Sequence, residues 1–216
     1  MPEFSLLQKI VIWVVPVIFA ITVHEVAHGW VANKLGDPTA RLLGRLTLNP
    51  IKHIDPIGTV ILPLVMMWTT GFAFGWAKPV PVDWRNLRHP KRDMALVAVA
   101  GPGANLFMFV LWMLLAKAAL AAEGSVGAAA APVYYMALAG MSVNALFMVL
   151  NLLPVPPLDG SRVLAAILPP RWALRFGQLE RYGLLIVVVL LVTGLLGKIL
   201  TPPMQALQGL ASLFLR

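Results

Sequence analysis

Long apolar runs separated by short polar stretches dominate the hydropathy pattern of this chain. The runs cover about residues 4–34, 57–76, 94–121, 133–153 and 182–200. A helix needs roughly 20 apolar residues to cross a hydrocarbon core of ~30 Å, and the runs are of that length. The pattern therefore predicts an all-α integral-membrane protein.

Composition supports a membrane protein and leaves no room for a sizeable soluble domain. Of the 216 residues, 59% are hydrophobic and only 12% are charged. We expect one membrane-embedded domain over residues 1–216, with a catalytic core at about 4–168, a C-terminal span at 182–200 and an interfacial tail at 202–216. The chain contains no cysteine, which excludes disulfides and thiolate metal sites.

The basic residues predict how the chain is threaded through the membrane. Lys and Arg gather in the loops 34–55, 78–93 and 154–181, whereas the loop 122–132 has none. Cytoplasmic loops carry an excess of Lys and Arg, so the net charge of +8 indicates membrane orientation and not nucleic-acid binding. A full crossing by residues 57–76 would put two basic loops on opposite sides. We therefore expect four transmembrane helices plus one re-entrant segment, with the N-terminus outside.

The first apolar run contains the pattern H-E-x-x-H, formed by His24, Glu25 and His28. Residues i and i+4 of a helix share a face, so both imidazoles can reach one metal ion with the glutamate beside them. Neutral imidazoles bind zinc, and a nearby carboxylate that is not a ligand can take a proton from water. Because ionisable side chains are costly inside a membrane span, this cluster indicates a functional site.

A catalytic zinc site needs a third protein ligand, and Asp159 is the best candidate. It lies in the stretch N-L-L-P-V-P-P-L-D-G over residues 151–160, where three prolines forbid a regular helix. An acidic side chain near membrane depth is costly unless a cation neutralises it. The alternative is that Asp159 caps a helix that starts near Ser161.

These motifs together resemble the site-2 protease family of zinc intramembrane proteases. The resemblance rests on H-E-V-A-H and N-L-L-P-V-P-P-L-D-G, with support from residues 49–58 and 101–105. It implies a site-2 protease-like core of the compact branch without PDZ or CBS domains. It also implies one Zn²⁺ per chain on His24, His28 and Asp159, with Glu25 as the catalytic base. Asn151 matches the family asparagine that holds the substrate carbonyl or its oxyanion.

Three other features carry open alternatives. Residues 74–82 predict a possible short edge strand for an extended substrate, and the alternative is an ordinary interfacial loop. His53 fits a fourth metal ligand, a hydrogen-bond partner of a ligand, a proton shuttle or an interfacial bystander. Asn105 and Asn144 fall inside spans, where an amide usually bonds a neighbouring helix; a substrate-binding role for Asn105 is the alternative.

The function expected from these observations is hydrolysis of peptide bonds in membrane-spanning substrate proteins. We expect a multi-pass protein of the cell membrane with its active site toward the cytoplasmic side. The alternative is a metal-ion transporter, because intramembrane His and Asp residues also mark ion paths. Transport favours ligands repeated in two halves of the chain, and this sequence has a single H-E-x-x-H and a single L-D-G.

Overall fold

The computed structural model describes residues 4–61, 64–66, 68, 75 and 77–216, and within these residues it is helical without any strand. The prediction of an all-α fold is therefore confirmed. The α-helices, in chain order, are α1 (Leu6–Leu35), α2 (Thr39–Leu42), α4 (Pro90–Val126), α5 (Ala130–Asn151), α6 (Asp159–Ile167), α7 (Pro170–Gly177), α8 (Gly183–Val192) and α9 (Leu195–Leu215). Short helices lie at Pro50–His53, Pro56–Ile61, Trp84–Asn86, Gly127–Ala129 and Gln178–Tyr182.

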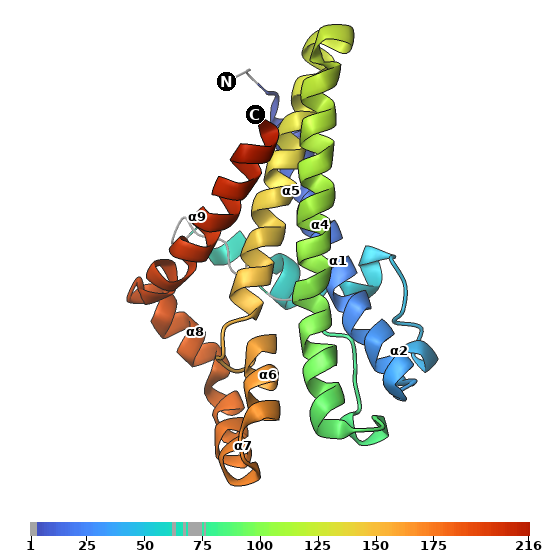
Figure 1. Cartoon of the computed structure of the whole chain (residues 1–216), viewed down its shortest axis with the longest axis vertical. Coiled ribbons are helices and arrows are strands. Elements are labelled where there is room, and N and C mark those ends of the chain that lie inside the picture. Colours follow the sequence, from blue (N-terminus) through green and yellow to red (C-terminus); the bar gives the residue numbers. More distant parts are fainter. Residues whose placement is uncertain (1–3, 62–63, 67, 69–74, 76) are drawn as a thin grey trace.

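The centre of the molecule is a bundle of α1, α4 and α5, with α9 against its side (Figure 1). All three bundle helices are long and apolar enough to cross a membrane, and the bent pair formed by residues 170–192 and α9 makes a fourth span if it is one broken span. Close packing of α4 and α5 depends on Gly140, because a Cβ there would lie 2.3 Å from the ring of Trp112. Small residues at such contacts let transmembrane helices approach closely.

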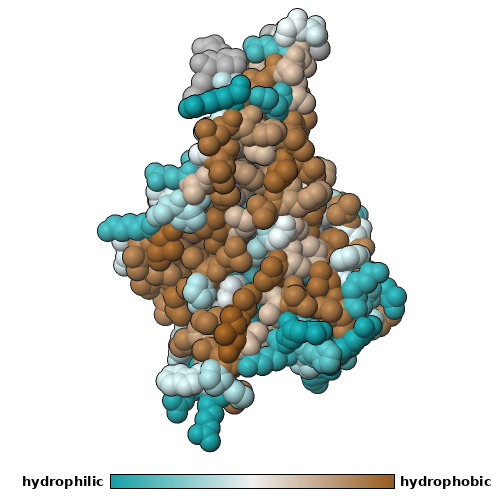
Figure 2. All heavy atoms as spheres, viewed as in Figure 1, coloured by the Kyte–Doolittle hydropathy of each residue, from teal (hydrophilic) through white to brown (hydrophobic). Residues whose placement is uncertain are grey.

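The outer surface of the bundle is apolar, as a bilayer requires. On the face shown in Figure 2, hydrophobic side chains cover most of the middle of the molecule, and hydrophilic groups gather mainly toward its two ends. Large apolar side chains of the long helices and of α8 are widely exposed, among them Trp13 at 55%, Phe107 at 62% and Leu185 at 61%. Exposed apolar area on this scale would not be stable in water. The chain is a membrane protein.

Both ends of α1 are set by local sequence. Ser5 and Gln8 form a reciprocal capping box at its start. At its end, Gly36 adopts a left-handed conformation with φ +117°, which glycine tolerates without a Cβ penalty. The chain then turns at Asp37, whose buried carboxylate accepts hydrogen bonds from Thr39, the Asp83 amide and Asn86. Burial would raise the pKa of Asp37, but these hydrogen bonds lower it overall.

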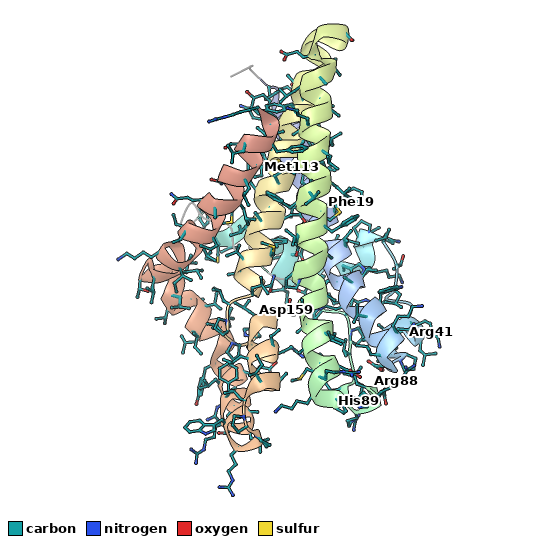
Figure 3. All side chains as sticks on the ribbon, in the orientation of Figure 1. Phe19, Arg41, Arg88, His89, Met113 and Asp159 are labelled. Atoms are coloured by element: carbon teal, nitrogen blue, oxygen red, sulfur yellow. The ribbon has the colours of Figure 1, made fainter. Side chains whose placement is uncertain are left out.

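The two basic loops 34–55 and 78–93 meet at one end of the bundle. The Arg88 amide donates to the Leu35 carbonyl at 3.1 Å, and the Lys78 amide donates to the His53 carbonyl at 3.0 Å. Figure 3 shows Arg41, Arg88 and His89 together at this end. Because residues 53 and 78 are hydrogen-bonded, the chain between them leaves and returns to the same place. The re-entrant segment expected at 57–76 lies largely outside the described residues and stays a prediction.

The C-terminal region, where we expected a span at 182–200, is bent. Helix α8 ends at Val192, Gly194 adopts φ +71°, and α9 continues at an angle of 79°. Ten residues of α8 rise only about 15 Å, too little to cross a bilayer alone. The tail is part of α9, and its Ala211 is buried against Phe109 and Met141. The apolar content of this region can be read from the sequence. The break depends on the backbone conformation of Gly194, which the hydropathy pattern does not predict.

Candidate metal centre

The three predicted ligands come together in the middle of the bundle. His24 and His28 lie one turn apart on the buried face of α1, and their Nε2 atoms are 3.0 Å apart. Asp159 Oδ2 lies 3.2 Å from His24 Nε2 and 3.3 Å from His28 Nε2. Within the described residues, this is the one group of three or more His, Asp or Glu side chains arranged for a metal ion.

The turn between α5 and α6 brings Asp159 to the histidines. Helix α5 ends at Asn151, and residues 152–158 turn so that α6 begins at Asp159 itself. The turn is tight against Gly160, where a Cβ would lie 2.2 Å from the Leu152 carbonyl oxygen. Asp159 thus stands at the inner end of α6, beside α4 (Figure 3). Asp159 is the first residue of α6 and not the cap of a helix that starts near Ser161, so the capping alternative is wrong, and its side chain faces the histidines.

Hydrogen bonds on the far side of each ring determine the histidine tautomers. His28 Nδ1 is 2.7 Å from the Val97 carbonyl oxygen, which can only accept, so Nδ1 carries the proton. His24 Nδ1 is 2.6 Å from Asn105 Oδ1, so it donates in the same way. Each neutral ring then presents an unprotonated Nε2 to the cluster. Such outer hydrogen bonds orient metal-binding histidines and raise their basicity.

A buried amide relay holds Asn105 in the orientation that His24 requires. The Asn105 Nδ2 group donates to the Ala20 carbonyl at 3.3 Å and to Asn144 Oδ1 at 3.0 Å. Asn144 Nδ2 in turn donates to the Gly140 carbonyl at 2.8 Å. Because both donors of Asn105 are used, its oxygen must face His24. Both asparagines are fully buried, so they link α1, α4 and α5, in agreement with the interhelical role expected for amides in spans.

The central atoms of the cluster are acceptors that face one another. Asp159 Oδ2 is buried and has no hydrogen-bond donor among the described residues, because the adjacent Nε2 atoms carry no proton. Three converging lone pairs repel unless a cation lies between them. The edge of a tetrahedron with Zn–ligand bonds of 2.0–2.1 Å is about 3.3 Å. The observed separations of 3.0, 3.2 and 3.3 Å fit three corners of such a site.

Glycine 101 is a part of the site whose role the sequence did not reveal. A Cβ on this residue would lie 2.4 Å from His28 Nε2 and 2.6 Å from His24 Nε2. Val97, Gly101 and Asn105 are spaced by four residues and therefore lie on one face of α4. Val97 supplies the carbonyl that binds His28, Gly101 leaves space for the two rings, and Asn105 supplies the amide that binds His24. The signal was the glycine four residues before an asparagine in an apolar run, a spacing that marks a shared helix face.

Glu25 lies beside the cluster and is held by the chain at residue 80. Its Oε2 accepts a hydrogen bond of 2.7 Å from the Val80 amide, and the side chain is half-buried. Glu25 does not belong to the group of ligand atoms. Glu25 therefore neighbours the histidine ligands on α1 without supplying a ligand atom to the group.

The segment 74–82 does not form the possible edge strand, as far as it is described. Residues 77–82 have no regular secondary structure, and residues 74 and 76 lie outside the described residues. The Lys78 amide is bonded to His53 and the Val80 amide to Glu25, while Pro79 and Pro81 have no N–H. Positions 78–81 therefore offer no unused amide for pairing with a substrate strand.

His53 is hydrogen-bonded to this segment and is not a member of the ligand group His24, His28 and Asp159. It is 1% exposed, its Nε2 donates to the Thr47 carbonyl at 2.9 Å, and its carbonyl accepts from Lys78. These bonds join the loop at 47–53 to the segment at 78. Within the described residues, His53 therefore joins two loops near the site and does not belong to the group of three ligand atoms.

Asn151 stands at the last residue of α5, one residue before the turn that packs on Gly160. Its Nδ2 donates to the Phe147 carbonyl at 3.0 Å. An amide nitrogen has two hydrogens, so this bond leaves one for another acceptor. The structure places Asn151 close in the chain to Asp159 but records no direct bond between the two among the described residues.

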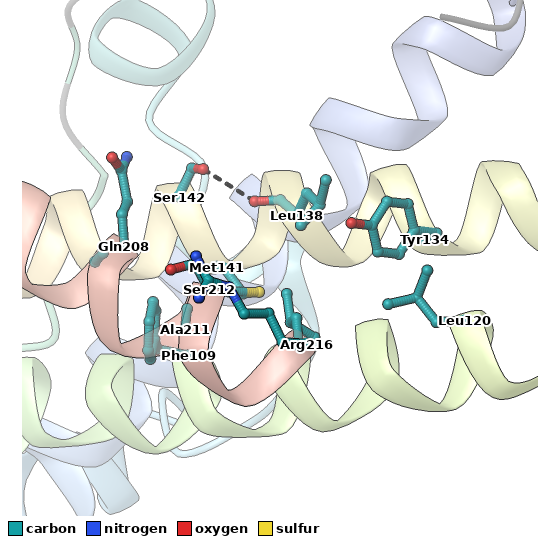
Figure 4. A pocket seen from close by; sticks show the side chains of 12 residues that line it. Phe109, Leu120, Tyr134, Leu138, Met141, Ser142, Gln208, Ala211, Ser212 and Arg216 are labelled. Atoms are coloured by element: carbon teal, nitrogen blue, oxygen red, sulfur yellow. Dashed lines mark hydrogen bonds between the residues drawn. The ribbon is translucent and has the colours of Figure 1, made fainter.

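A cavity of about 530 Å³ lies elsewhere, between α4, α5 and α9 (Figure 4). Its wall includes the apolar side chains Phe109, Leu138 and Met141, together with Ser142, whose hydroxyl donates to the Leu138 carbonyl. None of the predicted site residues lines it. The cavity is therefore separate from the metal centre.

Comparison with known proteins gives relatives that cover nearly the whole chain. A Bacillus subtilis protein with the provisional name zinc metalloprotease YwhC is 38% identical over 89% of this chain and 85% of its own length. Proteins provisionally named zinc metalloprotease Rip2 are 32% identical in Mycolicibacterium smegmatis and 29% in Mycobacterium tuberculosis. These two alignments cover 84% and 79% of this chain, and 66% and 62% of the relatives. No family model and no solved structure matches the chain significantly.

Proposed function

This chain belongs to the site-2 protease family of zinc metalloproteases, and we propose that His24, His28 and Asp159 hold its zinc ion while Glu25 is its catalytic base. It is an intramembrane zinc metalloprotease, which hydrolyses peptide bonds. The observation that carries the residue assignment is that Nε2 of His24, Nε2 of His28 and Oδ2 of Asp159 lie within 3.3 Å of one another.

The chemistry of the residues follows from their positions. When bound, zinc polarises the scissile carbonyl and lowers the pKa of a water molecule in the site. Glu25 accepts a proton from the attacking water and passes it to the nitrogen of the leaving amine. Asn105 and the Val97 carbonyl keep both histidines in the tautomer with a free Nε2. The second amide hydrogen of Asn151 is suited to donate to the substrate carbonyl oxygen as negative charge develops there.

We infer that the substrates are membrane-spanning proteins and that the site faces the cytoplasmic side of the cell membrane. His28 lies seven residues before the end of α1, so it is about 10 Å from the end of the bundle that carries the basic loops. Basic loops favour the cytoplasmic side. A substrate that enters from the bilayer must be locally unwound, because a helix hides its peptide bonds in its own hydrogen bonds.

The decisive experiment separates catalysis from metal binding. Glu25→Gln keeps the size of the side chain and removes the base, so zinc content should stay at one per chain. Cleavage of a membrane-spanning substrate in liposomes should fall about 10²- to 10⁴-fold, the usual contribution of general-base catalysis. Glu123→Gln, at an exposed position near the other end of α4, makes the same chemical change and should cleave normally. Undiminished cleavage by Glu25→Gln would remove Glu25 from this role.

The transporter alternative is not favoured. The relatives carry protease names, and Glu25 beside the ligands has a task in hydrolysis that ion passage does not require. In the same liposome experiment, a transporter would move zinc across the membrane and produce no cleaved substrate with either form of residue 25.

A further inference from the structure

We propose that the main-chain amide of Val80 is a positioning donor that holds the catalytic base Glu25 in place. The amide nitrogen lies 2.7 Å from Glu25 Oε2, across a separation of 55 residues in sequence. The proposal deepens the assigned protease function and rests on Glu25 acting as the base. It gives residues 78–80 a task other than the pairing with substrate that the sequence suggested.

The local sequence makes this donor unique in its stretch. Val80 stands between Pro79 and Pro81, and proline has no N–H. One amide is therefore available over three residues, and it is directed at Glu25. Hydrogen bonds from an amide to an ionised carboxylate are short and stronger than neutral ones, so one such bond can restrict the carboxylate to a single orientation.

The segment around Val80 is itself held from several sides. Arg45 Nη2 donates to the Lys78 carbonyl at 3.0 Å and to the Pro79 carbonyl at 3.4 Å. The Lys78 amide is bonded to the His53 carbonyl. The Val80 side chain is 7% exposed and packs over Gly29, where a Cβ would come within 2.7 Å of it. A donor held in this way stays in place when the substrate enters.

The bond leaves the other oxygen of Glu25 for chemistry. Among the described residues, Oε2 accepts from Val80 and no donor contacts Oε1. A carboxylate that swings freely would spend less time aligned with the attacking water, and a misplacement of about 1 Å can lower a rate about 10²-fold. Val80 therefore acts on the reaction through Glu25 and needs no contact with the substrate.

A spectroscopic test detects the bond without using activity. Protein labelled with ¹³C-carbonyl proline and ¹⁵N-valine gives signals from Pro–Val amides alone, and the sequence contains five such pairs, including those at Val80 and Val82. The Val80 amide proton should resonate far downfield in the wild type and move upfield in Glu25→Gln, while Val82 stays unchanged. The experiment works with or without zinc. A Val80 signal that does not respond to Glu25→Gln contradicts the proposal.

A kinetic test replaces the donor itself. Incorporation of the α-hydroxy acid analogue of valine at position 80 exchanges N–H for oxygen and keeps the side chain. We expect kcat for a membrane-spanning substrate to fall about 10- to 100-fold, with KM, zinc content and the unfolding temperature close to wild type. The same exchange at Val82, also a valine that follows a proline, is the matched control and should leave kcat unchanged.

A second variant covers the case in which the ester protein does not fold. Arg45→Met removes the clamp on the Lys78 and Pro79 carbonyls, and Arg41→Met removes an exposed arginine nearby. Arg45→Met should lower kcat and Arg41→Met should not, with Arg45→Lys restoring part of the rate. If Glu25→Gln is inactive while the Val80 ester and Arg45→Met have wild-type kcat, the positioning proposal fails alone. If Glu25→Gln is fully active, the assignment of the base fails first.

Discussion

Gly101→Ala should weaken zinc binding at least about 100-fold although it adds a single methyl group in a helix. The new Cβ would lie 2.4 Å from His28 Nε2, 2.5 Å from His24 Cε1 and 2.6 Å from His24 Nε2. The two Nε2 atoms are the proposed metal ligands. The substitution therefore tests whether the space in front of the two histidines is reserved for a bound ion.

The size of the effect follows from these distances. Ordinary contacts between a methyl carbon and a ring atom are about 3.4 Å or longer, so the histidines and α4 must separate by about 1 Å. Zinc sites tolerate ligand displacements of about 0.2 Å. The rings can move only by weakening the bonds to Val97 and Asn105, each 2.7 Å or shorter. Loss of outer hydrogen bonds alone lowers metal affinity about 10- to 100-fold, so we expect a loss of at least about 100-fold.

The assay is zinc per chain by mass spectrometry, with affinity from competition against a chelator. Gly103→Ala is the matched control, since a Cβ there meets no atom within 4 Å. Exchanging glycine for alanine in a helix stabilises it by about 1 kcal/mol, a gain that both variants share. Asp159→Ala is the reference for a lost ligand, and its zinc content should be well below one per chain.

One result would refute the reasoning. If Gly101→Ala binds zinc as tightly as Gly103→Ala, the Nε2 atoms of His24 and His28 do not face the ion. The metal would then have to bind elsewhere. A loss of zinc in both glycine variants would point to the helix and not to the site.

Three further outcomes are expected. Asn105→Leu removes the acceptor for His24 Nδ1, so zinc affinity should fall about 10- to 100-fold by chelator competition. A single cysteine at Arg88 should react with reagents only from the cytoplasmic side of cells; labelling from outside would reverse the topology. The lowered pKa of Asp37 means that its ionised form stabilises the fold above the unfolded pKa of about 3.9 and that this contribution is lost as pH falls through the lower folded value. Asp37→Asn should therefore lower the unfolding temperature near pH 7, with a difference that shrinks in acid.

The sequence by itself determined the features that depend on local periodicity. Apolar runs of membrane length predicted the bundle helices α1, α4 and α5, because a span needs a nearly fixed number of residues. The spacing of His24 and His28 predicted that both rings would share a helix face, which holds in any helix with 3.6 residues per turn. The placement of Lys and Arg predicted that loops 34–55 and 78–93 would lie together.

The tertiary structure decided which distant groups complete these local patterns. An aspartate near prolines can cap a helix or bind a metal, and the packing of Gly160 on Leu152 is what turns Asp159 toward α1. An amide in a span must find a partner, but 81 residues separate Asn105 from His24, and no periodicity links them. The role of the Val80 amide cannot be predicted from the pattern of side chains, because every residue except proline carries the same main-chain N–H group. Such contacts depend on how whole helices and loops pack, and that information is not local to any stretch of the chain.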